Sequence, residues 1–247
     1  MRYWLLMALC VSFSLLAKPV RISFSEEDFV PFYFVKGEKW QGFSFEYITV
    51  LLEQAELEYQ IVRLPWKRTL KLLQSGDIDV EAVIYRTPER QRFVTFSREA
   101  YFIDDVVVFC TRDCDFGYDG SLTQLYGKGI HVVRGYSYGA TFDNAALVTS
   151  AVDSEPQLHQ LAKAGRIRLG ASYLASLQWS ELYLSQPGIQ ILMPPIDREK
   201  VHFAISKKGR LSKTQIQRLQ QVNSQFIASD AYLKLLKKYS LEQGSVR

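Results

Sequence analysis

The sequence contains few of the residues that build metal and redox centres: three cysteines, three histidines and three methionines among 247 residues. The histidines, His131, His159 and His202, have no metal-ligand spacing, and no Cys-x-x-Cys pair is present. Neither a zinc site nor a thioredoxin-like redox centre is therefore expected. Charge of neither sign dominates, because 30 Lys+Arg against 26 Asp+Glu leave a net charge of +4. The basic residues are also scattered, which argues against nucleic acid as a partner.

A long hydrophobic run is absent except at the start of the chain. Residues 1–17 contain Arg2 and then an uncharged, mostly apolar stretch that ends before Lys18. This stretch is shorter than the roughly 20 residues that a membrane-spanning helix needs. A basic start, a short apolar run and a small final residue are typical of a cleaved secretory signal peptide, and an uncleaved anchor helix is the alternative.

Two cysteines, Cys110 and Cys114, follow the predicted signal peptide. An even number of cysteines in an exported chain favours disulfide formation, here with closure of a very small loop. We therefore expect a structural disulfide between them.

The rest of the chain has no repeat or low-complexity tract, and its 47% hydrophobic and 23% charged residues are typical of a globular protein. Hydrophobic periodicity predicts strands over residues 20–24, 59–62, 79–84, 106–109, 130–133, 189–192 and 202–205. It predicts helices over residues 45–56, 66–74, 157–164, 173–184, 213–227 and 231–239, with Ser212 as the N-cap of the fifth. This alternation indicates an α/β fold with mostly parallel strands.

The segment Tyr85-Arg-Thr-Pro-Glu-Arg90 directly follows a predicted buried strand. Ligands of α/β sheets bind beyond the carboxyl ends of strands, and a guanidinium group offers a fork of donors that matches a carboxylate. One interpretation is therefore an anion site. The other is that Arg86, Arg90 and Arg92 are ordinary surface charges.

The segment Gly135-Tyr-Ser-Tyr-Gly139 has the Gly-x-Ser-x-Gly pattern of a hydrolase nucleophile. Asp153 and then His159 or His202 follow in the order that a catalytic triad would require. The alternative is a glycine-rich turn whose N–H groups and Ser137 hydroxyl hold an anion.

Aromatic residues stand at two further strand-to-helix turns. Trp66 lies at a predicted helix start, and Phe29 lies in the segment Glu-Glu-Asp-Phe-Val-Pro-Phe-Tyr that begins at Glu26. A lone tryptophan often only fills a core. Several such turns that carry aromatic and polar groups together favour a ligand pocket.

A series of short motifs runs in order along the chain: Pro31-Phe32, Trp40-Gln-Gly-Phe-Ser-Phe-Glu46, Gln74-Ser-Gly-Asp-Ile-Asp79, Arg86-Thr-Pro-Glu-Arg-Gln91, Val94-Thr-Phe-Ser97, Tyr101, Gly135-Tyr-Ser137 and Leu161-Ala-Lys-Ala-Gly-Arg-Ile167. With these motifs the chain, from Lys18 to about Leu241, resembles the family 3 extracellular solute-binding proteins, the periplasmic polar amino acid binders of ABC transporters. The resemblance implies the type II periplasmic binding protein fold: two α/β lobes, two crossing hinge strands, and a ligand held by hinge closure. Lobe one would hold residues 18–108 and 204–243 and lobe two residues 109–203, with the crossings at 106–109 and 202–205 and a tail at 244–247.

The same resemblance implies roles for individual residues. Arg90 matches the arginine that holds a ligand carboxylate, and Ser137 matches a hydroxyl that assists it. Phe29 matches an aromatic cover over the ligand, Glu26 a nearby acid, and Trp66 a position in the pocket wall.

The sequence departs from the family pattern at two candidate ligand contacts. Tyr85 stands in Val83-Ile84-Tyr85-Arg86, where amino acid binders are rich in serine, and Tyr173 stands where they place the acid that binds the ligand ammonium. The usual Gly-Arg-x-Asp also reads Gly165-Arg-Ile-Arg168. An amino acid or a related small carboxylate is expected, and an organic acid or an aromatic ligand stays open.

The expected function is that of a monomeric periplasmic binding protein without catalysis or cofactor, which serves an inner-membrane ABC permease. One alternative is a periplasmic enzyme of the same fold, either dehydratase-like or a serine hydrolase at Ser137. Glu26, Glu27 and Asp28 are the acids near enough to serve such an enzyme. The other alternative is a sensing module for a separate receptor.

Overall fold

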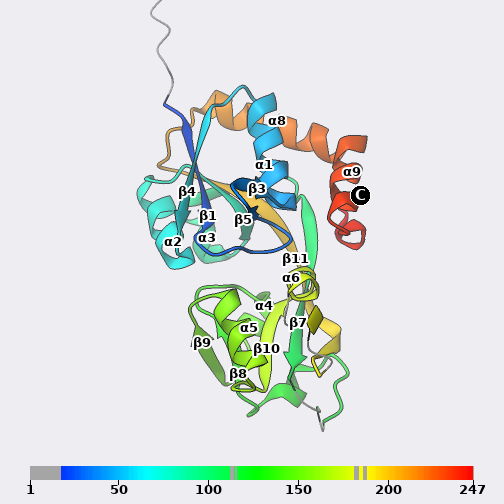
Figure 1. The fold of residues 1–247 in the computed structure, drawn as a ribbon. Helices are drawn as coiled ribbons and strands as arrows, with labels where there is room; N and C mark the ends of the chain where they lie inside the picture. Colours follow the sequence, from blue (N-terminus) through cyan, green and yellow to red (C-terminus); the bar gives the residue numbers. More distant parts are fainter. Residues whose placement is uncertain (1–17, 112–113, 115, 181–183, 186–187, 247) are drawn as a thin grey trace, which may run out of the picture.

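The computed structural model (Figure 1) describes residues 18–111, 114, 116–180, 184–185 and 188–246. Two lobes are joined by two long strands, β7 (Phe102–Cys110) and β11 (Gln190–Ser206). This is the two-lobed α/β architecture predicted from the sequence. The predicted signal peptide, residues 1–17, lies outside the described residues.

Lobe one is the upper body in Figure 1. Its strands are β1 (Val20–Ser25), β2 (Phe34–Lys36), β3 (Lys39–Gln41), β4 (Tyr59–Leu64), β5 (Val80–Tyr85) and β6 (Val94–Phe96). Its helices are α1 (Phe43–Gln54), α2 (Trp66–Ser75), α3 (Pro88–Gln91), α8 (Lys213–Ile227), α9 (Asp230–Lys238) and the 3-10 turn η2 (Glu242–Gly244). Strand β1 pairs in parallel with β4 and β5, so the turns after these three strands meet at one edge of the sheet.

Lobe two is the lower body in Figure 1. Its strands are β8 (Ile130–Val133), β9 (Thr149–Val152) and β10 (Leu169–Tyr173). Its helices are the 3-10 turn η1 (Leu122–Leu125), α4 (Ala140–Asp143), α5 (Glu155–Lys163) and α6 (Leu174–Trp179). Strand β8 pairs in parallel with both β9 and β10.

The hinge strands make one continuous sheet of both lobes, in the order β4-β1-β5-β11-β7-β10-β8-β9 with β6 beside β11. Strand β7 is antiparallel to β11 and to β10, and β11 is antiparallel to β5 and β6. The expectation of mostly parallel strands is therefore wrong for the hinge and holds only inside each lobe. The predicted lobe boundaries stay a prediction.

Two strand predictions and one helix prediction need correction. The strands predicted over 189–192 and 202–205 are parts of the single strand β11, which begins at Gln190, because its ladder with β7 continues past a register shift between Leu192 and Asp197 that accommodates two prolines. Residue 173 ends strand β10 instead of starting a helix. That strand passes so close to Phe109 that a Cβ on Gly170 would lie 2.4 Å from its ring, so a small residue is required there.

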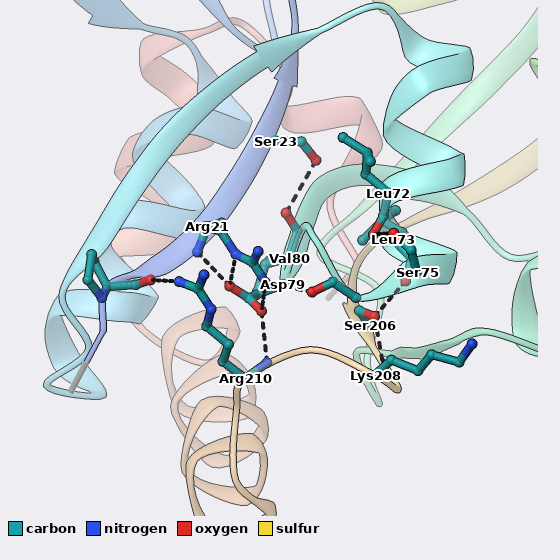
Figure 2. A network of polar contacts seen from close by, with 12 residues as sticks. Arg21, Ser23, Leu72, Leu73, Ser75, Asp79, Val80, Ser206, Lys208 and Arg210 are labelled. Atoms are coloured by element: carbon teal, nitrogen blue, oxygen red, sulfur yellow. Dashed lines mark hydrogen bonds and ion pairs between the residues drawn. The ribbon is translucent and has the colours of Figure 1, made fainter.

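A polar network anchors the start of the lobe-one sheet (Figure 2). Asp79 is fully buried and accepts hydrogen bonds from the backbone and side chain of Arg21 at 2.9 Å and from the backbone of Arg210 at 2.8 Å. Burial alone would raise the pKa of Asp79, but the bonds from these two arginines outweigh it and lower the pKa below its ordinary value. The network ties β1 and β5 to the segment after β11.

A disulfide joins Cys110, the last residue of β7, to Cys114. This agrees with the pairing expected from the sequence. The bond therefore lies where the first hinge strand leaves the shared sheet in lobe two.

Candidate functional site

A small cavity of about 30 Å³ lies between the lobes, at the edge where β1, β4 and β5 end. Its lobe-one wall is formed by Phe29, Tyr33, Trp66, Val83, Ile84, Tyr85 and Arg90, and its lobe-two wall by Tyr136 and Tyr173. Five of the seven residues predicted to bind the ligand therefore line this cavity. No carboxylate does so among the described residues.

Arg90 is the charged group of this cavity. It lies in the short helix α3, whose N-cap Thr87 accepts its backbone N–H at 3.2 Å, and its side chain is turned inward, so that only 5% of the residue is exposed. Nη1 donates to the carbonyl of Tyr85 at 2.8 Å and Nη2 to the carbonyl of Gly135 at 3.0 Å. Burial lowers the pKa of Arg90, and none of the ion pairs between described residues includes it. The other three of its five N–H donors have no hydrogen-bond partner among the described residues.

Trp66 and Arg90 hold the lobes together at the same atom. The indole Nε1 of Trp66 donates to the carbonyl of Gly135 at 2.8 Å, the carbonyl that also accepts from Arg90. The guanidinium carbon lies 5.2 Å from the centre of the Trp66 ring, within cation–π range. Two lobe-one donors thus converge on one lobe-two carbonyl. Trp66 faces this interface and does not merely fill the core.

An aromatic cluster closes the cavity from lobe two. The ring of Tyr173 stacks on Tyr136 with 5.7 Å between centroids and lies 4.8 Å from the ring of Tyr85. Phe29 meets both Tyr136 and Tyr173 edge-on, at 6.4 and 6.1 Å. The hydroxyl of Tyr173 donates to the carbonyl of Ser137 at 3.0 Å. Sequence reasoning missed Tyr136, although its place between Gly135 and Ser137 after a strand was a usable signal.

Ser137 contacts the site through its backbone. Its hydroxyl donates to Oδ2 of Asp143 at 2.6 Å, while the Asp143 Oδ1 accepts the N–H of Tyr138 at 2.9 Å, which is an arrangement that stabilises the turn before α4. The hydrolase interpretation required Asp153 and a histidine beside this hydroxyl. Asp153 instead pairs with Arg134.

The two candidate histidines of that interpretation have other partners. Nδ1 of His202 lies 2.9 Å from the hydroxyl of Ser97, and Nε2 of His159 lies 3.4 Å from Oε1 of Glu155. Burial and the nearby Arg86 lower the pKa of His202 to about 4. The contacts of Ser137 are therefore those of a turn residue.

Glu26 lines a second cavity beside the first, with a volume of about 110 Å³. The two cavities share the side chains of Phe29, Tyr33, Trp66 and Tyr136 as walls. The acids of the second cavity come from the loop after β1 and from the turn into α5: Glu26, Glu27, Asp28, Asp153 and Glu155. Glu26 was predicted to contact the ligand, whereas Glu27, Asp28 and Asp153 were considered for an enzyme and Glu155 was not singled out.

The sequence pattern of the bacterial extracellular solute-binding proteins, family 3, matches residues 22–242. The chain belongs to this family. The match covers both lobes and both hinge strands of this solute-binding protein. It agrees with the resemblance inferred from the sequence motifs.

Solved structures similar to this solute-binding protein include holo ArgBP from T. maritima, with 21% identity, 89% of this chain and 95% of that chain covered, and a TM-score of 0.73. The arginine-, lysine-, histidine-binding protein ArtJ from Geobacillus stearothermophilus has 18% identity, 90% and 95% coverage, and a TM-score of 0.76. A histidine kinase sensor domain with similarity to periplasmic binding proteins has 15% identity, 90% and 96% coverage, and a TM-score of 0.76. At these identities the likeness is one of fold. No curated protein matches the sequence.

The described residues of this solute-binding protein include no helix that is long and apolar enough to cross a membrane. They also contain no group of three or more His, Cys, Asp or Glu side chains placed to hold a metal ion.

Proposed function

We propose that this chain is a periplasmic solute-binding protein that captures a small carboxylate-bearing ligand between its lobes and delivers it to an inner-membrane ABC-type permease. The observation that carries the proposal is the guanidinium group of Arg90, which is buried between the lobes. Among the described residues it has no carboxylate partner, and only two of its N–H groups donate hydrogen bonds. A buried charge is costly unless an opposite charge or several hydrogen bonds compensate it. A ligand carboxylate supplies both.

The ligand also has to couple to lobe movement. The cavity beside Arg90 has a volume of about 30 Å³, which is room for very few atoms. Ligand entry therefore requires that the lobes or the rings of Tyr136 and Tyr173 move apart. Once a carboxylate lies against Arg90, closure returns the lobe-two turn at Gly135 to the same guanidinium, so the ligand stabilises the closed arrangement.

The relatives support two kinds of partner. Another similar structure is the substrate-binding protein of an amino acid ABC transporter, and this supports uptake. The similarity to a histidine kinase sensor domain favours a second candidate, a sensing role toward a separate receptor. Uptake of the bound compound should fall in cells that lack this chain. Unchanged uptake together with a lost signalling response would favour the receptor.

The test of the ligand site compares Arg90→Gln with Arg92→Gln. Both variants remove one positive charge from α3 or its end, but Arg92 is exposed. Residues 18–247 with the disulfide intact are screened by thermal unfolding against amino acids and small carboxylates, and the Kd of each compound found is measured by calorimetry. Loss of a charge-assisted contact of about 3 kcal/mol should weaken binding roughly 150-fold in Arg90→Gln. Arg92→Gln should match the wild type.

Two results would count against the proposal. Equal affinity in Arg90→Gln and in the wild type would remove Arg90 from the site. Recovery of a chemically altered compound after incubation would contradict a purely binding function, which requires that the ligand be returned unchanged.

A further inference from the structure

We propose that the second cavity binds a positively charged group of the ligand, so that the ligand is a carboxylate with a distal ammonium or guanidinium group. The carboxylate end rests on the proposed function, because it requires Arg90. The cationic end is argued from the second cavity alone. The inference also holds that an ammonium on the α-carbon is not required.

Acids of both lobes line the second cavity. Glu27 belongs to the loop after β1 in lobe one, and Glu155 begins α5 in lobe two. Two other acids of the cavity have cationic partners: Asp28 pairs with Arg63 at 3.2 Å, and Asp153 pairs with Arg134. Like charges that approach across a closing cleft repel one another, so the closed arrangement favours a cation between them.

Glu155 is an unusual acid for the first turn of a helix. Only 3% of the residue is exposed, and its Oε1 accepts the hydroxyl of Ser172. Its Oε2 is buried and has no hydrogen-bond partner among the described residues, and the same is true of Oε2 of Glu27. On the same helix, Nε2 of His159 lies 3.4 Å from Oε1 of Glu155, and this imidazole is charged only when protonated. Buried carboxylate oxygens without donors are rare in native proteins, and a ligand cation would supply the missing donors.

The walls of the cavity suit an organic cation. Phe29, Tyr33, Trp66 and Tyr136 line it beside the acids. Aromatic faces attract ammonium and guanidinium groups, and carboxylates at the same site fix their position. A ligand group that combines positive charge, N–H donors and some apolar surface fits this lining.

The two cavities separate the acids from Arg90. Arg90 lies against one side of the wall that contains Trp66, and Glu27 and Glu155 line the cavity that shares this wall. The proposal therefore places the carboxylate and the cation in different cavities, at opposite ends of one ligand. Beside Arg90 the cavity is lined by Tyr173, whose hydroxyl donates a hydrogen bond to the carbonyl of Ser137. No acid among the described residues lines this cavity. An ammonium next to the carboxylate finds no counter-charge there.

Four six-carbon compounds test this directly: lysine, with both ammonium groups; 6-aminohexanoate, with the distal one; 2-aminohexanoate, with the α one; and hexanoate, with neither. The same series at four and five carbons covers shorter ligands. At the best chain length we expect the distal ammonium to tighten binding at least 10-fold and the α-ammonium to change Kd less than 3-fold. The Kd values are measured by calorimetry on residues 18–247.

Charge-neutral variants locate the cation. Glu155→Gln and Glu27→Gln should each weaken binding of the distal ammonium compound about 10-fold and leave the compound without it unchanged. Glu53→Gln, on the exposed face of α1, makes the same charge change as a control. The unfolding temperature without ligand reports whether each variant is folded. If Glu155→Gln fails to fold, Glu27→Gln decides the matter.

The outcomes separate this inference from the proposed function. Binding that depends on Arg90 but gains nothing from a distal ammonium overturns the inference and leaves the proposed function intact. Binding that is unaffected by Arg90→Gln overturns the proposed function. A gain from the α-ammonium larger than that from the distal one, or no binding of any compound in the series, also overturns the inference.

Discussion

Asp104 is a carboxyl group buried in the hinge strand β7, where both lobes touch it. It is 2% exposed, accepts the backbone N–H of Ala175 in lobe two at 3.4 Å, and lies 3.5 Å from the hydroxyl of Tyr85 in lobe one. Burial raises the pKa of Asp104 to about 8, and the hydrogen bond from Ala175 opposes this only in part. The folded protein therefore keeps a proton on this group at neutral pH.

The sign of the effect on stability follows from the two pKa values. An aspartate in the unfolded chain titrates at about 3.9, so the unfolded chain has lost this proton at neutral pH. The stability that comes from Asp104 is fully present below about pH 4 and is lost progressively as the pH rises through about 8. Between pH 6 and pH 9 the linkage relation gives a loss of about 3 kcal/mol from this group alone.

The perturbation is Asp104→Asn, which keeps an oxygen for the N–H of Ala175 and cannot ionise. Glu81, another buried acid whose pKa burial raises to about 8, is present in both proteins, so their difference isolates Asp104. Urea unfolding of both proteins is measured at pH 6, 7, 8 and 9 with the disulfide intact. Between pH 6 and pH 9 the free energy of unfolding of the wild type should fall by about 3 kcal/mol more than that of the variant.

Parallel pH profiles of the two proteins would refute this reasoning. They would mean that Asp104 ionises in the folded state near its ordinary pKa, and hence that water reaches it through the hinge.

The remaining predictions concern the fold. Asp79→Asn should lower the free energy of unfolding by about 3 kcal/mol at pH 7, because it leaves the mostly buried Arg21 without its counter-charge. The deficit should shrink as the pH falls below about 4, because there the Asp79 carboxyl of the unfolded wild-type chain takes up a proton that the folded protein still excludes. Asp77→Asn, at an exposed position, should cost little at any pH, and a constant deficit in Asp79→Asn would contradict this account. Mass spectrometry of the exported protein after alkylation should find no free thiol at Cys110 or Cys114 before reduction, and two alkylated thiols would exclude the disulfide.

Local sequence signals predicted the elements whose ends are fixed by their own residues. Helix α8 begins where predicted, because the Ser212 side chain accepts the N–H of Gln215 and the Gln215 side chain returns the bond. Strand β10 was missed because its sequence, with Gly170 and small neighbours, is determined by contact with Phe109, 61 positions earlier in the chain. Small residues that are required by contact with a distant aromatic ring do not produce the hydrophobic alternation that predicts a strand.

The residues of the candidate site also fall into those that local sequence signals located and those that they missed. Arg90 and Trp66 follow predicted strands, so the general rule for α/β sheets located them. Tyr136 could have been found by the same rule, because it follows the predicted strand 130–133, whereas Glu155 carries no such signal. An acid in the first turn of a helix is ordinary in sequence, because it interacts favourably with the helix dipole. Only the folded structure shows that Glu155 is buried and that its Oε2 has no donor among the described residues.

The indole of Trp66 has an optical consequence. It spans the interface through its bond to the carbonyl of Gly135 and meets Tyr136 edge-on, with 6.0 Å between centroids. Indole emission depends on the polarity around the ring and on the hydrogen bond at Nε1, and separation of the lobes replaces both of these contacts with water. The intrinsic fluorescence of the protein therefore contains a signal for domain opening, and closure can be followed in real time without an attached dye.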